Sequence, residues 1–111
     1  MAVDKSLMSG SNAMLLMKLL EEKDMYGYEM IETLKERSMN VFSLKAGTLY
    51  PILHKLEEQG YVKAYEEEAA GKVRKYYALT KAGKKTLLAK REEWEVYSQA
   101  VERVLGGVCY G

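Results

Sequence analysis

The segment from Ser43 to Gly60 has apolar residues at helical spacing. Its large aliphatic side chains stand at i, i+3, i+4 and i+7 and therefore share one helix face: Leu49, Ile52, Leu53 and Leu56. The opposite face carries mixed polar and aromatic groups: Thr48, Tyr50, His54 and Lys55. The pattern predicts a short helix that packs on one side and presents donors, a cation and aromatic rings on the other.

Pro51 lies inside this predicted helix, where a proline removes one backbone hydrogen bond and its ring presses on the carbonyl four residues earlier. That carbonyl belongs to Gly47, whose backbone can shift most easily. We interpret the two residues as a matched pair that tightens the first turns. At the other end, Gly60 follows Gln59 in the position of a C-terminal helix cap.

Two further helices are predicted before this one. The first begins at about Ser11 and is apolar nearly all round, so it must be covered on more than one side. The second opens with Met25–Glu29 and points an apolar stripe inward: Met30, Ile31 and Leu34. The short apolar segment Val41–Phe42 is interpreted as a link that can form a brief strand.

The residues after Gly60 have the composition of strands. Tyr61–Glu66 and Lys72–Leu79 are rich in tyrosine and valine and alternate loosely between apolar and polar side chains. Ala69–Lys72 supplies the turn between them. This region is predicted to be a hairpin.

A final helix begins after Thr80, which is placed as its N-cap. Apolar residues repeat along it every seven positions, with others between them: Leu87, Trp94, Val101 and Val108, then Tyr97, Val104 and Leu105. A stripe of about three heptads predicts a helix that pairs with another chain. The expected divisions are the helices and hairpin over residues 1–79, the dimerisation helix over 80–105 and a flexible tail over 106–111.

Length and composition describe one ordinary domain with a modest core: 111 residues, 48% apolar and 30% charged. No apolar run approaches the roughly 18 residues of a membrane span, and the N-terminus lacks the pattern of a signal peptide. A single cysteine excludes a disulfide within the chain and fits a reducing interior. We expect a cytoplasmic protein without membrane contact.

The net charge of +1 lacks the strong basic excess that marks many nucleic-acid-binding proteins. Basic residues nevertheless cluster with no acid between them: Lys72, Arg74, Lys75, Lys81, Lys84 and Lys85. A local positive field of this kind can engage phosphates. Strand alternation predicts Lys72 and Arg74 on one side of the hairpin and Lys75 on the other, beside Tyr77.

Helix, helix, helix, hairpin and long helix form the plan of a winged helix-turn-helix with a C-terminal dimerisation helix, a mostly helical α+β fold. DNA contacts are expected from the polar face of the third helix and from the hairpin: Lys45, Thr48, Tyr50, His54, Lys55, Lys72, Arg74 and Lys75. The alternatives are that the helix face is merely solvated and that the hairpin lysines only block edge-to-edge aggregation.

No catalytic or metal-binding constellation emerges from the sequence. His54 is the only histidine and has no Cys, His or carboxylate at ligand spacing, so no metal site is expected. Nothing supplies a nucleophile with an adjacent base, and no cofactor is expected. Cys109 has no basic neighbour that would favour a redox switch.

Four short motifs stand out within roughly residues 11–83: Tyr26–Glu29, Gly47–Pro51, Leu53–Glu57 and Arg74–Thr80. They are similar to motifs of the PadR-like family of bacterial transcriptional regulators. The block Gly-Thr-Leu-Tyr-Pro is the most specific. With one helix after the hairpin, the chain resembles the short subgroup, which includes dimeric multidrug-sensing repressors.

The resemblance implies a ligand site as well as DNA binding. In the multidrug-sensing relatives a tryptophan at the place of Trp94 faces its dimer mate and stacks on drugs, and Asn12 and Ala13 are similar to positions that line the same pore. The implied function is a homodimeric repressor of a double-stranded operator, released by a small planar ligand. The simpler interpretation of Trp94 is a core or dimer anchor. An alternative for the whole chain is a winged-helix module that binds protein or drug without regulating DNA.

Overall fold

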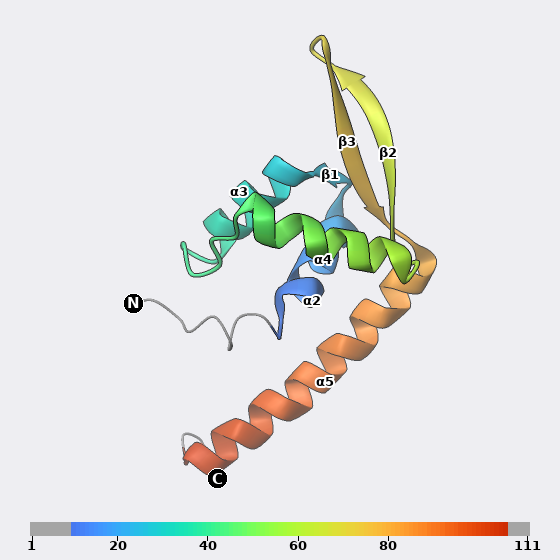
Figure 1. Cartoon of the computed structure of the whole chain (residues 1–111). Coiled ribbons are helices and arrows are strands. Elements are labelled where there is room, and N and C mark those ends of the chain that lie inside the picture. The colour runs from blue at the N-terminus through green and yellow to red at the C-terminus, as the bar shows by residue number, and fades with distance from the viewer. Residues whose placement is uncertain (1–9, 107–111) are drawn as a thin grey trace.

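The computed structural model describes residues 10–106. The elements follow in the order α2 (Asn12–Glu22), β1 (Met25–Tyr26), α3 (Gly27–Arg37), α4 (Ala46–Glu58), β2 (Val62–Ala69), β3 (Lys72–Leu79) and α5 (Lys81–Leu105). Figure 1 shows a small helical body with two projections: the hairpin of β2 and β3 extends from one side, and α5 runs away on the other. This is the mostly helical fold with a small sheet that the sequence predicts.

The core forms around α2, which packs against α3, α4, β3 and α5. Its buried residues cover more than one side of the helix, as the nearly all-round apolar pattern predicts: Leu16, Met17, Leu19 and Leu20. The other elements add apolar side chains that are all but inaccessible to solvent: Met30, Leu49, Leu53, Tyr77 and Leu87.

The sheet has the order β1-β3-β2, and both pairings are antiparallel. The strand β1 corrects one sequence prediction. Met25 and Tyr26 do not open the second helix but pair with Tyr77 and Tyr76 of β3, and α3 begins only at Gly27. The reason is long-range pairing, because a two-residue strand is stable here only through a partner some fifty residues away. The brief strand considered at Val41–Phe42 does not form either.

The hairpin turns through two residues, Ala70 and Gly71, and both have positive φ, 53° and 77°. Two central residues with positive φ are what a type I′ turn requires, and its twist matches that of the flanking strands. The predicted hairpin is therefore confirmed, with a turn tighter than the four-residue segment 69–72.

The junction between α4, the hairpin and α5 depends on Gly60, Tyr61, Thr80 and Gly83. Gly60 has a φ of 81° and its N–H donates to Glu57, while Tyr61 donates to Leu56, a Schellman C-cap. The Thr80 hydroxyl donates to the Gly60 carbonyl at 2.7 Å and accepts from the Gly83 N–H at 3.0 Å. The predicted caps at Gly60 and Thr80 are confirmed, and Thr80 additionally joins the end of α4 to the start of α5.

Helix α4 runs without interruption through Pro51. A side chain at Gly47 would meet no neighbour within 4 Å outside the backbone of its own helix. Gly47 is therefore not needed to make room for another element. Its predicted role beside Pro51 would be limited to a shift of the α4 backbone that accommodates the proline ring.

No helix within residues 10–106 combines the length and the hydropathy that crossing a membrane would need. The first residue of the predicted tail over 106–111, Gly106, forms the C-cap of α5 with a φ of 76°. The rest of that tail, with Val108 and Cys109, lies outside the described residues, as do residues 1–9.

Candidate nucleic-acid interface

Helix α4 has the two faces that its sequence predicts. Leu49, Leu53 and Leu56 are buried, and Ile52 is half-buried. The polar face is exposed at Thr48, His54 and Lys55. Lys45 is the exposed N-cap residue, and its carbonyl accepts from Thr48 and Leu49, although its side chain makes no capping bond. Four of the five residues named on this helix are therefore free to approach a DNA groove.

Tyr50 is engaged within the protein. A methyl group at Gly27 would overlap the Tyr50 hydroxyl and would lie only 2.7 Å from Cζ of the ring. The hydroxyl therefore points at the backbone of the first residue of α3. With 37% of its surface exposed, the Tyr50 ring still presents an edge to solvent 6.3 Å from the His54 ring. Two of the family-like motifs, Tyr26–Glu29 and Gly47–Pro51, thus meet at this contact.

The basic residues of β3 alternate between the two faces of the hairpin. Arg74 places its guanidinium 4.4 Å from the centre of the Tyr26 ring, on the face that also carries Tyr76. Lys75 lies on the other face, 5.6 Å from the centre of the Tyr77 ring. The prediction that Arg74 and Lys75 lie on opposite faces of the hairpin is confirmed. Lys72 is two residues before Arg74 in the strand and therefore lies on the same face as Arg74.

Acidic residues lie directly across the hairpin from these bases, which the sequence analysis missed. Glu66 pairs with Lys75 and Glu67 pairs with Arg74 in the register of β2 and β3. The signal was present in the run Glu66–Glu68, because a tight hairpin must bring that run opposite residues 73–75. The positive field of the hairpin is therefore weaker than the sequence of β3 alone indicates.

The cluster of six bases is also divided in space. Lys72, Arg74 and Lys75 lie in the outer half of β3, whereas Lys81, Lys84 and Lys85 lie in the first turns of α5, beyond the other end of the strand. Figure 1 shows that the start of α5 adjoins the C-terminal end of α4, on the side away from the tip of the hairpin.

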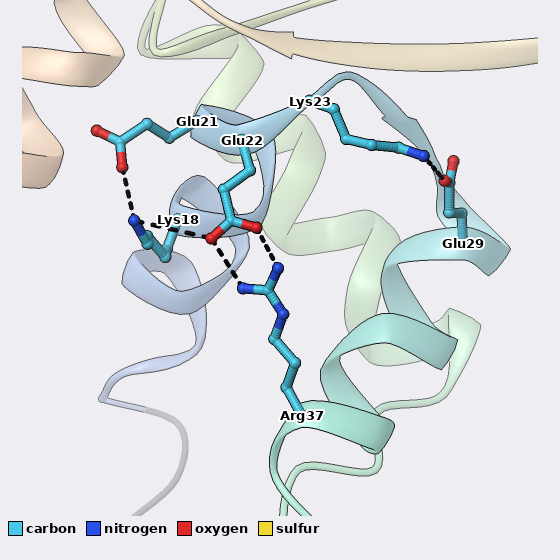
Figure 2. Close-up of polar contacts among 6 residues, drawn as sticks. All are labelled: Lys18, Glu21, Glu22, Lys23, Glu29 and Arg37. Atoms are coloured by element: carbon cyan, nitrogen blue, oxygen red, sulfur yellow. Dashed lines mark hydrogen bonds and ion pairs between the residues drawn. The ribbon is translucent and has the colours of Figure 1, made fainter.

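Ion pairs link α2 and the residue that follows it to α3 (Figure 2). Arg37, in the last turn of α3, donates to both carboxylate oxygens of Glu22, which lowers the pKa of that carboxyl. Lys23 lies 2.7 Å from a Glu29 carboxylate oxygen, and this contact raises the pKa of the lysine. Exposed pairs of this kind add little stability each, but these two link neighbouring helices at both ends of α3.

A polar contact also joins the hairpin to the segment before β1. The Tyr65 hydroxyl donates to the Asp24 carboxylate at 2.6 Å, and this bond raises the pKa of Tyr65 to about 12. Neither residue was singled out from the sequence. Tyr77 is different, because burial raises the pKa of its hydroxyl, which finds no hydrogen-bond partner among the described residues.

The residues named for ligand binding do not share one pocket: Trp94 lines pockets that differ from the one lined by Asn12 and Ala13. Trp94 is 48% exposed on α5 and, with Met14 and Tyr97, lines a pocket of about 480 Å³. Asn12 and Ala13 line a second pocket of about 420 Å³, between α2, α4 and α5. Lys90 and Glu93 line both. Asn12 is 6% exposed and its Oδ1 atom has no hydrogen-bond partner among the described residues.

Within residues 10–106 no three potential metal ligands come together. What the geometry does bring together is an exposed helix face, held by a packed three-helix body, and a projecting two-stranded hairpin. These define a winged helix-turn-helix fold, in which α4 occupies the position of the recognition helix and the β2–β3 hairpin, hereafter the wing, flanks it.

The comparisons with known proteins identify the family. The model of the transcriptional regulator PadR-like family matches residues 16–89. The chain belongs to the PadR-like family of transcriptional regulators, a family of DNA-binding proteins.

Known relatives cover nearly the full length. A structure of a transcriptional regulator from Clostridium thermocellum is 30% identical with a TM-score of 0.85, over 92% of this chain and 97% of that one. A PadR family transcription regulator from Clostridium difficile is 36% identical with a TM-score of 0.75, over 86% and 99% of the two chains. Uncharacterized protein X of Lysinibacillus sphaericus is 31% identical over 107 residues, 96% of this chain and 98% of that protein.

Proposed function

We propose that this regulator is a homodimeric repressor that binds a pseudo-palindromic operator and releases it when a small planar ligand binds at the dimer interface. The observation that carries the DNA-binding part is the exposed polar face of α4, presented beside a projecting wing. An α-helix with such a face fits the major groove, where Lys55 can reach guanine acceptors or a phosphate and Thr48 can meet a thymine methyl group.

Each subunit of the dimer would supply one recognition helix. In a symmetric dimer the two helices would lie about 34 Å apart, one turn of DNA, which implies an operator with two inverted half-sites. The groove contacts proposed are Lys45, Thr48, His54 and Lys55, and the phosphate contacts proposed are Lys72 and Lys75. Tyr50 and Arg74, also named from the sequence, are left out of this set: the Tyr50 hydroxyl points at the backbone of α3, and Arg74 is half-buried against the Tyr26 ring. Lys75 is kept because it remains exposed, although it lies 5.6 Å from the Tyr77 ring. A cytoplasmic location is proposed with this function, since the operator would lie on chromosomal DNA.

The dimer is proposed to form through α5. Beyond Leu87, which is buried in the subunit, the heptad positions Trp94 and Val101 are exposed, together with Tyr97, Val104 and Leu105. An apolar stripe of this length along a projecting helix is the pattern of a helix that pairs with a second copy.

The ligand is proposed to contact Trp94, with Asn12 and Ala13 in the adjoining pocket. A planar aromatic molecule can stack on an exposed indole. It releases DNA only if it binds better to a dimer whose recognition helices are wrongly spaced for the operator. Titration with planar cationic dyes is expected to quench the fluorescence of Trp94, the chain's only tryptophan. Unchanged emission across several dye classes would remove the ligand from the proposal.

The test of DNA binding is a mobility-shift titration with the promoter of the protein's own gene over a range of salt concentrations. Lys55→Ala is expected to weaken binding, and Lys72→Ala to reduce the slope of log affinity against log salt by about one. Lys84→Ala is the matched control, because it removes the same charge from an exposed position in the first turns of α5, away from the outer half of the wing. Equal effects of all three changes would indicate binding by net charge alone.

The near-neutral charge and the acidic strand β2 favour a second candidate, a winged-helix module that binds protein or a small molecule without regulating DNA. Failure of the wild-type protein to shift any promoter fragment at low salt, with dye binding retained, would support this second function.

A further inference from the structure

The outer half of the wing has little support from the body of the protein. The strand β1 pairs with β3 only at Tyr76 and Tyr77. Beyond that point the residues of both wing strands are exposed, except Ala69 and Arg74. Figure 1 shows the hairpin extending well past β1 into solvent. The inner ends of the strands are anchored in the core through Val62 and Tyr77, so the outermost contacts that can set the direction of the wing lie near residues 74–77.

A chain of contacts on one face of the sheet occupies this place. Arg74 lies over the Tyr26 ring at 4.4 Å, and Tyr26 meets Tyr76 edge to face with ring centres 5.5 Å apart. Tyr76 stacks on Tyr65, with ring centres 5.8 Å apart and planes within 15°. Tyr65 closes the series by donating its hydroxyl to Asp24. Asp24 and Tyr26 precede α3 directly, so the chain of contacts ties both wing strands to the start of that helix.

Arg74 differs from the two lysines beside it in the wing. Its side chain is half-buried, whereas Lys72 and Lys75 are exposed. The acid across the hairpin does not distinguish Arg74 from Lys75, since Glu67 faces Arg74 and Glu66 faces Lys75 in the strand register. A planar guanidinium suits stacking on a tyrosine ring, a geometry that an ammonium does not reproduce.

We propose that Arg74, Tyr26, Tyr76, Tyr65 and Asp24 form a tyrosine clamp that sets the direction of the wing, and that Arg74 is a positioning residue of the clamp rather than a phosphate ligand. The wing then reaches DNA through its exposed lysines, at an angle fixed by contacts with the segment that precedes α3. This inference rests on the proposed DNA binding, but the clamp itself can be tested without DNA.

The first experiment measures the direction of the wing in the full chain. Spin labels are attached through Glu32→Cys on α3 and Val73→Cys in the wing, both exposed positions outside the clamp, in a Cys109→Ser background. The distance distribution between the labels is expected to be narrow in the parent protein and broader or displaced with Arg74→Ala or Tyr65→Phe. Arg74→Lys should fall between the parent and Arg74→Ala, and Lys72→Ala should leave the distribution unchanged.

A loss of stability alone would not alter the distances in the folded protein, so this measurement separates positioning from general stabilisation. Far-ultraviolet circular dichroism checks that each variant is folded. Tyr65→Phe removes a single hydroxyl and provides a mild second variant if Arg74→Ala fails to fold. Parent-like distributions for both Arg74→Ala and Tyr65→Phe would overturn the clamp.

The second experiment compares DNA affinity at several salt concentrations. Arg74→Ala is expected to weaken operator binding about two- to fivefold, the effect of losing one exposed cation–π contact, with the salt slope unchanged. Lys72→Ala should lower the slope by about one. A slope lowered equally by Arg74→Ala would make Arg74 a phosphate ligand and overturn its assignment. If the parent protein binds no DNA, the proposed function fails while the distance measurements still decide the clamp.

Discussion

Gly27 and Tyr50 lie in different motifs of the sequence, yet the side chain at each position restricts which side chain the other position can hold. The Tyr50 hydroxyl occupies the space that a side chain at position 27 would need. Periodicity places Tyr50 on the polar face of α4, and this is correct, but it cannot show that the ring folds back onto α3. At the scale of single residues, the sequence predicts which face a side chain is on and leaves its partner undetermined.

Gly27→Ala is expected to lower the free energy of unfolding by about 1–3 kcal/mol, the usual cost of overpacking, because the added methyl group must displace the Tyr50 ring. Urea unfolding monitored by circular dichroism measures the change. In a Tyr50→Ala background the same substitution should be neutral or stabilising, since alanine is a better helix former than glycine.

Gly47→Ala is the matched control for this prediction, because a side chain at Gly47 meets no neighbour within 4 Å outside its own helix backbone. It should therefore stabilise the protein or leave it unchanged. Equal destabilisation by Gly27→Ala and Gly47→Ala would show that the Tyr50 contact is not the cause.

The helices and the hairpin could be predicted at the scale of elements because each carries its own local signal. The apolar spacing of α4, the cap at Thr80 and the tyrosine-rich strands all lie within short windows. The strand β1 could not be predicted in this way, since Met25 and Tyr26 are extended only because β3 pairs with them. The tyrosine clamp could not be predicted for the same reason, because the hydrogen bond between Asp24 and Tyr65 joins residues that are 41 positions apart in the sequence.

The wing turn offers a prediction at this scale. Ala70 has a φ of 53°, a left-handed conformation that disfavours alanine and that asparagine tolerates. Ala70→Asn is expected to raise the free energy of unfolding by about 0.5–1 kcal/mol, because Asn-Gly is the preferred pair in a type I′ turn. Chemical denaturation provides the measurement. Ala69→Asn, one residue earlier in β2, should give no such gain, and a gain at both positions would point to a cause other than the turn.

At the scale of the whole molecule, the bases proposed to reach DNA lie far from the apolar stripe of α5. These bases are on α4 and the wing, where β2 partly offsets them, whereas the stripe of exposed apolar residues lies on the distal part of α5. Other exposed apolar side chains, such as Tyr28 and Val73, lie singly elsewhere. The sequence predicts the stripe on α5 through its heptad spacing. It does not show that Trp94 and Asn12 line separate pockets, because that depends on how α2 lies against α5.

Val101→Glu is expected to shift the protein from dimer to monomer in sedimentation experiments, because it places a charge among Tyr97, Ala100, Val104 and Leu105. Val96→Glu is the control, since Val96 is 70% exposed and faces away from the stripe by helical spacing. The same mass for Val101→Glu and the parent protein, with the parent a dimer, would mean that subunits pair through another surface.

The Thr80 junction has a mechanical consequence. Its hydroxyl bonds to the end of α4 and to the first turn of α5, and a side chain at Gly83 would overlap the Tyr61 carbonyl, so little sliding is available there. Helix α5 has 25 residues and is therefore about 37 Å long. If the junction acts as a fulcrum, a displacement of about 3 Å at the distal end of α5 turns the helix by only about 5°. A movement of that size at the distal end of α5 would thus reach the recognition helix as a small rotation of the whole DNA-reading body.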